Sequence, residues 1–331
     1  MDSREIIRRV LDYEAPPRIG MNYSPWGEAP RLDDLAFAGP SGPDNAWTPD
    51  GAGGEVQTDE WGNVWRRLPE RTSGGEVLRP ALPTWEALDT YQPPDLAHPA
   101  RYQDAARVRE QHPDRYLLGG VEGAGFATAR YLRRMEQYLC DCAESPEQVA
   151  RLNLMVNDLA LAEVDRWAEV GADGVFFCED WGTEERLLVS PRMWREQFAL
   201  LYERLISQAH ARGLTVWMHS CGYIKDIIPP LVEMGLDVLQ LDQPELNGLE
   251  FLAQFSGRVT YWCPVDIQKI LPTGDRELIQ GRAREMLRRL AARGGGFIAK
   301  DYPDNASLGV DPLWQQWGYE VFAAEGAYPP G

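Results

Sequence analysis

The chain has 331 residues, of which 44% are hydrophobic and 25% charged, an ordinary composition for a soluble globular protein. Its formal net charge of −18 gives a surface that repels phosphate backbones, so nucleic acid is not expected as a partner. The first residues, 1–5, carry no apolar signal region, and no apolar run is long enough to span a bilayer. We therefore expect a cytoplasmic protein that does not enter a membrane.

The N-terminal third predicts few regular elements. Residues 3–12 have the spacing of a short helix, and 18–23 are typical of a first strand. Residues 24–99 are rich in proline and glycine, and we expect them to form an irregular flap over the site. Within that flap, residues 55–67 alternate polar and apolar side chains and predict a β-hairpin that turns at 62–63.

From residue 101 onward, strand and helix patterns alternate. This alternation predicts a parallel sheet with right-handed crossovers. The expected helices are 101–111, 126–142, 146–170, 191–212, 224–234, 248–255, 275–293 and 311–323. The expected strands are 116–121, 175–178, 214–219, 238–241, 259–263 and 297–299. With the first strand they make seven, and an eighth is placed only loosely. We expect an α/β fold, a (β/α)₈ TIM barrel formed by residues 1–331 as one domain, with the 24–99 flap as its irregular insertion.

The end of the 214–219 strand carries His219 and Cys221. Side chains two residues apart on a strand share a face, so the imidazole and the thiol should point the same way. Zinc takes nitrogen and sulfur ligands, which makes the pair half of a tetrahedral zinc site. The alternative interpretation is a barrel strand that ends in these residues without binding a metal. Cys263, at the end of another strand, is the first candidate for a third ligand, and Asp180, Glu179 and Asp301 are substitutes.

Acidic residues recur where the predicted strands end, which is where barrel enzymes place their chemistry. A ring of carboxylates is repulsive unless a cation, a proton or a basic substrate lies among them. A single acid of this kind is more often a helix cap. We expect Asp180, Glu122 and Glu179 to be catalytic. We expect Trp181, Asp242, Asp266 and Asp301 to contact the substrate.

The remaining cysteines and the tryptophans are less specific. Cys178 is expected to be a small core residue, and Cys140 and Cys142 face different sides of a helix. The chain has twelve tryptophans. Several are expected in loops, where they could line an aromatic cleft or equally contact the core or a second copy in a homodimer.

Several sequence blocks resemble the uroporphyrinogen-decarboxylase-like superfamily. Residues 178–184 and 187–191 look like its "DDxGTQ…LLISP" block, and 219–222 with 231–239 look like its "HSCG…LxExGVDVL" block. Residues 265–268 and 294–298 are similar to its "VDxQ" and "GGGyI" blocks. The similarity runs from about residue 115 to the end. True decarboxylases carry an N-terminal Arg-Gln-Ala-Gly-Arg block that binds substrate carboxylates, and that block is absent here.

The other branch of the superfamily comprises corrinoid-dependent methyltransferases, in which His-x-Cys supplies two zinc ligands and a later Cys the third. The resemblance implies that His219 and Cys221 bind Zn²⁺. The later Cys follows the Gly-Gly-Gly strand in the family, but this chain has Lys300-Asp301-Tyr302 there. The third ligand is therefore Cys263 or an acid, or zinc is not held in the usual way.

The resemblance implies a zinc-dependent methyltransferase of the demethylase type. It would move a methyl group between a small ether, amine or thiol and the corrinoid (cobalamin) of a partner protein. The alternatives are a decarboxylase of a small acid and a barrel that binds a small molecule without catalysis.

Overall fold

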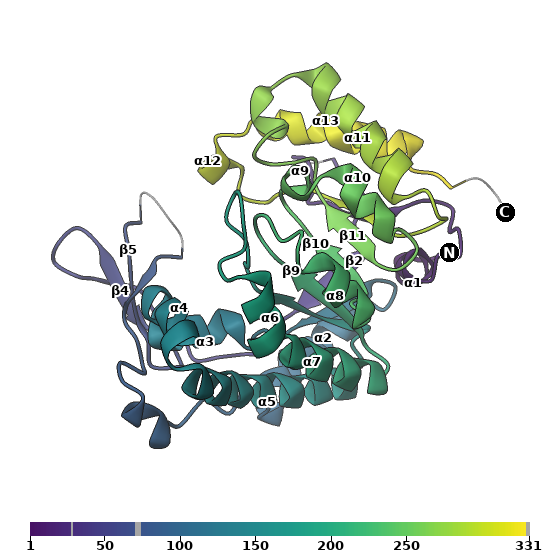
Figure 1. Ribbon diagram of the computed structural model, residues 1–331. Coiled ribbons are helices and arrows are strands. Elements are labelled where there is room, and N and C mark those ends of the chain that lie inside the picture. The colour runs from purple at the N-terminus through teal and green to yellow at the C-terminus, as the bar shows by residue number, and fades with distance from the viewer. Residues whose placement is uncertain (28, 70–73, 329–331) are drawn as a thin grey trace.

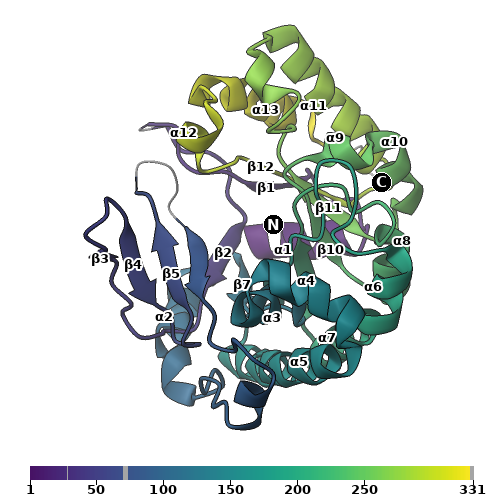
Figure 2. The same ribbon diagram turned by 60° about the vertical axis from the view of Figure 1, so that its left-hand side comes forward.

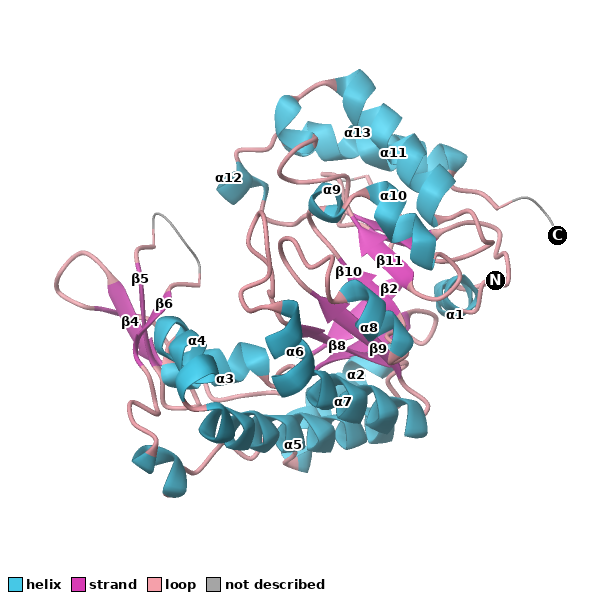
Figure 3. Ribbon diagram, viewed as in Figure 1, coloured by secondary structure: helices cyan, strands magenta, loops and turns pink. Residues whose placement is uncertain are grey.

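The computed structural model describes residues 1–27, 29–69 and 74–328 of the chain. Its centre is a sheet of eight parallel strands with helices around it (Figures 1 and 3). The strands are β1 (Gly20–Asn22), β2 (Leu35–Ala38), β7 (Tyr116–Gly120), β8 (Gly174–Cys178), β9 (Thr215–His219), β10 (Val238–Gln240), β11 (Thr260–Cys263) and β12 (Phe297–Lys300).

The sheet closes into a barrel. Its order is β1-β12-β11-β10-β9-β8-β7-β2, so the barrel strands from β2 to β12 lie side by side in chain order, β1 pairs with β12, and β1 and β2 are the two edges. The backbone N–H of Asp34 donates to the carbonyl of Met21 at 2.7 Å, and that of Tyr23 donates to Leu32 at 3.2 Å. These bonds join the two edges. The predicted (β/α)₈ barrel is confirmed.

The eighth strand lies inside the stretch that we expected to be irregular. β2 has only four residues, and it pairs in parallel with β7 from Leu35↔Tyr116 to Ala38↔Gly119. Its run lies in a stretch rich in proline and glycine with no helical pattern after it, and it becomes a strand because it fills the place between β1 and β7.

Thirteen α-helices lie within the described residues. They are α1 (Ser3–Leu11), α2 (Gln103–Gln111), α3 (Phe126–Arg133), α4 (Met135–Glu144), α5 (Pro146–Val170), α6 (Pro191–Gln197), α7 (Ala199–Ala211), α8 (Ile228–Glu233), α9 (Pro244–Asn247), α10 (Leu249–Leu252), α11 (Arg276–Leu290), α12 (Asn305–Leu308) and α13 (Pro312–Glu325). The expected helices at 126–142 and 191–212 are each divided into two, at Arg134 and Phe198.

The amino-terminal end of the barrel is closed by α1, which is seen through the ring of strands in Figure 2. Its buried side chains Ile6, Ile7 and Val10 belong to the same apolar cluster as the residues that fill the barrel. Those interior residues are Leu35, Tyr116, Leu118, Trp217, Val238, Trp262 and Ile298. A second, larger cluster lies between the strands and the outer helices. Strand residues can therefore be assigned to the inner or the outer face by the cluster they join.

A four-stranded antiparallel sheet stands beside the barrel (Figures 1 and 2). It consists of β3 (Thr48–Pro49), β4 (Glu55–Thr58), β5 (Val64–Arg67) and β6 (Glu76–Arg79). The predicted hairpin is the β4–β5 pair. This sheet contacts the barrel domain through Trp65, whose ring meets that of Tyr131 on α3 edge-on at 4.8 Å.

Candidate metal centre

Three side chains of different chemistry meet at the carboxyl ends of β8 and β9. The Nε2 of His219 lies 3.2 Å from the Oδ1 of Asp180 and 3.2 Å from the Sγ of Cys221. One ligand atom from each residue lies within 4.8 Å of the other two. Nitrogen, sulfur and oxygen donors are all common zinc ligands, and in a tetrahedral zinc site they lie about 3.5 Å apart. The donor set and spacing therefore fit a zinc ion with one open position.

The geometry of β9 explains why His219 faces inward. Trp217 belongs to the barrel-filling cluster, and side chains two residues apart share a face, so His219 projects into the open end of the barrel. Gly222, with a φ of +82°, then turns the chain after Cys221. A Cβ at this glycine would lie 2.4 Å from the backbone of Gly182, so the loops that carry Asp180 and Cys221 can approach only because both positions are glycine.

A series of hydrogen-bonded polar side chains lies behind His219 and orients its imidazole ring. Gln240, level with His219 on β10, accepts a hydrogen bond from the Nδ1 of His219. Because Nδ1 carries this proton, Nε2 is the nitrogen that faces Asp180 and Cys221, and it can bind a metal once it is deprotonated. The side-chain amide of Gln240 donates to Asp242 at 2.7 Å, and Asp242 also accepts from the Nζ of Lys300 at 2.9 Å.

Arg130 on α3 holds Asp180 from the opposite side. Its guanidinium donates to the Oδ2 of Asp180 at 3.4 Å and to the hydroxyl of Tyr131 at 3.1 Å. Burial would raise the pKa of Asp180, but its hydrogen bond with His219 and the charges of His219 and Arg130 lower that pKa well below the usual range. Asp180 is therefore an anion at neutral pH, as a metal ligand must be.

The expected third ligand Cys263 does not join this group. Its side chain is fully buried in the cluster outside the barrel, while the preceding residue, Trp262, fills the interior. The strand's period of two sends adjacent side chains to opposite faces, so Cys263 faces away from the site. Asp180, which the sequence offered as a substitute, occupies that place beside His219 and Cys221.

Glu179 and Trp181 also point away from the site, because they flank Asp180 on alternating sides. The carboxylate of Glu179 is buried and accepts the backbone N–H groups of Ala124 at 2.6 Å and Ala127 at 3.0 Å. Burial raises the pKa of Glu179 to about 7. Trp181 is buried and stacks on Phe126 at 3.7 Å. Both residues hold the start of α3, and the catalytic role expected for Glu179 and the substrate contact expected for Trp181 do not agree with these positions.

The two later aspartates expected to contact substrate hold loops instead. Asp266 is fully buried and accepts the backbone N–H groups of Glu245, Gln268 and Lys269. Asp301 accepts the N–H of Ser24 at 3.1 Å and lies 3.5 Å from the guanidinium of Arg31. Asp242 is different because it belongs to the series of polar side chains behind His219.

Glu122 lies in a separate acidic group with Glu163 and Glu60. Its backbone N–H donates to the buried carboxylate of Glu163 at 3.1 Å. Burial and the nearby charge of Glu60 raise the pKa of Glu122. Glu60 is paired with Arg101 at 2.7 Å. Glu122 is not a member of the Asp180–His219–Cys221 group.

Three residues that the sequence analysis did not propose for the site lie around the candidate metal ligands. Gln240, Arg130 and Lys300 contact the group directly or through Asp242, and only Lys300 had been noted, as the residue in the place of a family cysteine. Cys178 is exposed and pairs in register with His219, so the prediction of a core residue is wrong. Counting every second residue from the interior residues Phe176 and Val238 would have placed Cys178 and Gln240 on the inner face.

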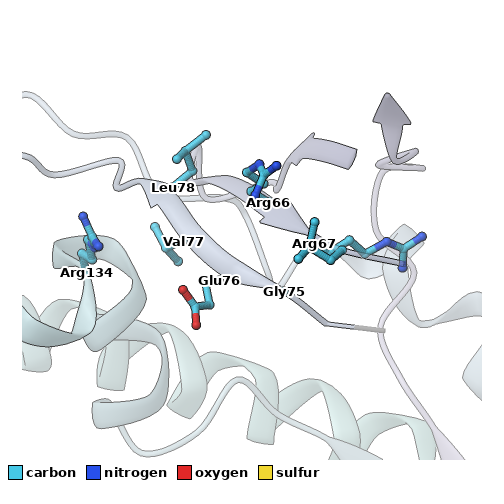
Figure 4. A pocket seen from close by; sticks show the side chains of 8 residues that line it. Arg66, Arg67, Gly75, Glu76, Val77, Leu78 and Arg134 are labelled. Atoms are coloured by element: carbon cyan, nitrogen blue, oxygen red, sulfur yellow. The ribbon is translucent and has the colours of Figure 1, made fainter. Parts of the chain in front are cut away.

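One pocket borders the candidate metal centre, and a second pocket lies apart from it. One, of about 530 Å³, reaches Cys221 from the side and is lined by the loops at Gly182–Glu184, Gln243 and Ile267–Gln268. The other, of about 350 Å³, lies on the antiparallel sheet between Arg66, Val77 and Arg134, as Figure 4 shows. None of the three candidate ligands lines that second pocket.

The fold and the site together define a (β/α)₈ barrel protein with a candidate metal centre at the carboxyl ends of its strands. The family model for uroporphyrinogen decarboxylase (URO-D) matches residues 68–300, and the chain belongs to this family. No curated protein matches the chain. The described residues contain no helix long and apolar enough to cross a membrane.

Solved structures resemble the chain in fold. A methyltransferase from Methanosarcina mazei is 17% identical with a TM-score of 0.60, over 76% of this chain and 74% of that one. D-psicose 3-epimerase from Clostridium cellulolyticum H10 is 10% identical with a TM-score of 0.40, over 72% and 84%. A chitinase catalytic domain from Ostrinia furnacalis is 12% identical with a TM-score of 0.39, over 70% and 83%. At these identities the likeness concerns the barrel.

Proposed function

We propose that this protein is a zinc-dependent methyltransferase that moves a methyl group between a small methylated substrate and the corrinoid of a partner protein. The observation that carries the proposal is the convergence of Asp180, His219 and Cys221, whose ligand atoms lie within 4.8 Å of one another. The Methanosarcina methyltransferase, similar in fold, supports the same reaction class. The −18 net charge disfavours nucleic acid as the partner.

Zinc held by these three residues would supply a Lewis acid to the heteroatom that carries the methyl group. The chain's own residues prepare the ligands: Gln240 keeps the Nδ1 of His219 protonated, and Arg130 orients Asp180. In the transfer, the bond between the methyl carbon and the heteroatom breaks, and its electron pair stays on the heteroatom. A reduced corrinoid on the partner protein would be the methyl acceptor, and it would supply the electron pair for the new bond to carbon.

Residues 24–99, apart from β2, are proposed to cover the open end of the barrel. This proposal is supported by the contact of Trp65 with Tyr131, because the Tyr131 hydroxyl accepts a hydrogen bond from Arg130, the residue that holds Asp180. A bound substrate could thus order the insertion and the metal ligand together.

The metal is tested by zinc content. The wild-type protein and the variants Cys221→Ala, His219→Ala and Cys140→Ala are purified without added metal and analysed by mass spectrometry. We expect about one zinc per chain in the wild type and in Cys140→Ala, an exposed thiol on α4 that serves as the matched control. We expect little zinc in the other two. Equal zinc in all four proteins would contradict the proposal.

Decarboxylation of a small acid is the second candidate, which the family assignment favours. Arg130 and Lys300 provide cations near the site that a carboxylate substrate would need. Incubation with candidate methyl donors and cob(I)alamin, with carbon dioxide and methylcobalamin measured in the same samples, separates the two reactions. Binding of the same compounds without either product would indicate a barrel that binds a small molecule without catalysis.

A further inference from the structure

One aromatic ring is exposed although its strand directs it into the barrel. Phe37 on β2 lies two residues after Leu35, which belongs to the barrel-filling cluster, yet 45% of Phe37 is exposed. Its ring stacks on Trp262 at 5.8 Å with an interplanar angle of 19° and meets Phe176 at 6.4 Å and 71°. Because the other end of the barrel is closed by α1, the free face of Phe37 looks toward the carboxyl ends of the strands.

The strand beside β2, which is β7, ends in a glycine on the inner face of the barrel. Gly120 ends β7 on the inner face, two residues after Leu118. A Cβ added to Gly120 would meet nothing closer than the carbonyl of Ala38, at 3.6 Å. Interior positions of small barrels are normally filled by side chains, so the absence of one here leaves room for a flat group against Phe37.

A cation borders the same aromatic group. The Nζ of Lys300 lies 5.7 Å from the centre of the Trp262 ring and donates to Asp242. An ammonium has three donors, and Asp242 takes one of them. With zinc bound, the charges of the metal, Lys300 and Arg130 outweigh those of Asp180, Asp242 and the Cys221 thiolate. The site is then net positive inside a strongly acidic protein.

We propose that the methylated substrate of this site is an aromatic acid: a flat ring packed between Phe37 and Gly120, with one anionic group held by Lys300. The proposal rests on the function proposed above and specifies its substrate class. An aliphatic methyl donor would leave the aromatic face exposed, and a cationic amine would be repelled by Lys300 and the metal.

The test measures binding by isothermal titration calorimetry of the zinc-loaded protein, without turnover. The ligands are 4-methoxybenzoate, which has ring and anion, anisole, which has only the ring, and methoxyacetate, which has only the anion. We expect 4-methoxybenzoate to bind at least about tenfold more tightly than either of the others. Equal affinities, or no binding of 4-methoxybenzoate, would overturn the proposal.

Two variants test which residues cause the preference for 4-methoxybenzoate. Gly120→Leu should weaken 4-methoxybenzoate binding at least about tenfold by filling the space, whereas Gly281→Leu, at an exposed site on α11, should not. Lys300→Met should remove the advantage of 4-methoxybenzoate over anisole, and the exposed Lys269→Met should keep it. Wild-type binding by Gly120→Leu and Lys300→Met would refute the assignment. If Lys300→Met does not fold, Lys300→Gln replaces it.

Failure of this inference can be distinguished from failure of the proposed function. A protein that contains zinc and transfers methyl groups, but shows no preference for the aromatic acid, refutes the substrate class alone. A protein that binds the aromatic acid selectively, but contains no zinc and produces no methylcobalamin, refutes the proposed function and leaves the binding site.

Discussion

The Oδ1 of Asp180 lies 3.2 Å from the Nε2 of His219, although the backbone of Asp180 has a φ of +38°. A non-glycine residue with positive φ is strained, and such strain persists where surrounding contacts hold it. Here the N–H of Cys221 donates to Asp180 at 3.2 Å and Arg130 contacts it from the other side. The strained turn places a carboxylate beside the imidazole of His219.

Asp180 is therefore expected to be the third zinc ligand. Asp180→Ala should lower zinc affinity at least about tenfold, since one of three protein donors is lost. Competition with a chromophoric chelator measures this affinity. Asp226→Ala, an exposed aspartate beyond Cys221, is the matched control and should bind zinc like the wild type. Unchanged affinity in Asp180→Ala would leave the ion with only His219 and Cys221.

Gln240 should act through His219. Gln240→Leu removes the acceptor for the Nδ1–H of His219, and the loss of such a partner typically costs about 10–100-fold in metal affinity. The same chelator competition applies, with Gln111→Leu on the exposed end of α2 as control. A merely structural role for Gln240 would lower the midpoint of thermal unfolding without changing zinc affinity.

Cys263 and Cys221 should behave in opposite ways. Cys263→Ala should keep its zinc but lose about 1–2 kcal/mol of unfolding free energy, because it leaves a small cavity in the outer core. Cys221→Ala should lose zinc. Urea unfolding of the zinc-free proteins measures the first effect without the contribution of the metal. Loss of zinc from a folded Cys263→Ala protein would restore Cys263 as a ligand.

Glu163 should make stability depend on pH. Burial and the charge of Glu122 raise the pKa of Glu163 well above its ordinary value, and its Oε1 has no hydrogen-bond partner among the described residues. The folded state therefore binds a proton that the unfolded state has released once the pH exceeds the ordinary value of 4.5. The associated stability is complete below that pH and is lost as the pH rises through the folded-state pKa.

Glu163→Gln imitates the protonated carboxyl at every pH. We expect the variant and the wild type to unfold at similar temperatures near pH 4.5, and the variant to be more stable at pH 7. Thermal unfolding followed by circular dichroism at both pH values measures the difference. Glu110→Gln, an exposed glutamate on α2, controls for the change in net charge. A variant that is less stable than the wild type at pH 7 would show that the buried carboxylate is held by contacts that favour its charge.

The alternation of strands and helices after residue 101 was sufficient to predict the barrel, and the motif at 219–222 indicated the strand end that carries the candidate metal centre. Both are local patterns: apolar runs separated by helical periodicity, and two ligands that share one strand face. By contrast, β2 could not be recognised, because its short run lies in a stretch rich in proline and glycine and no helical pattern follows it, whereas the equally short β11 and β12 follow predicted helices.

The sequence alone thus determined the class of fold and the pair His219 and Cys221. Only the tertiary structure decided which other residues lie beside this pair. Adjacent residues of a strand face opposite sides of the sheet, and the backbone φ and ψ of a turn residue determine where its side chain points. That is why Cys263 and Glu179 are turned into the packing while Asp180, Gln240 and Lys300 gather at the open end. The exposed face of Phe37 is likewise visible only once distant strands are brought together, since its neighbours Phe176 and Trp262 lie on other strands of the barrel.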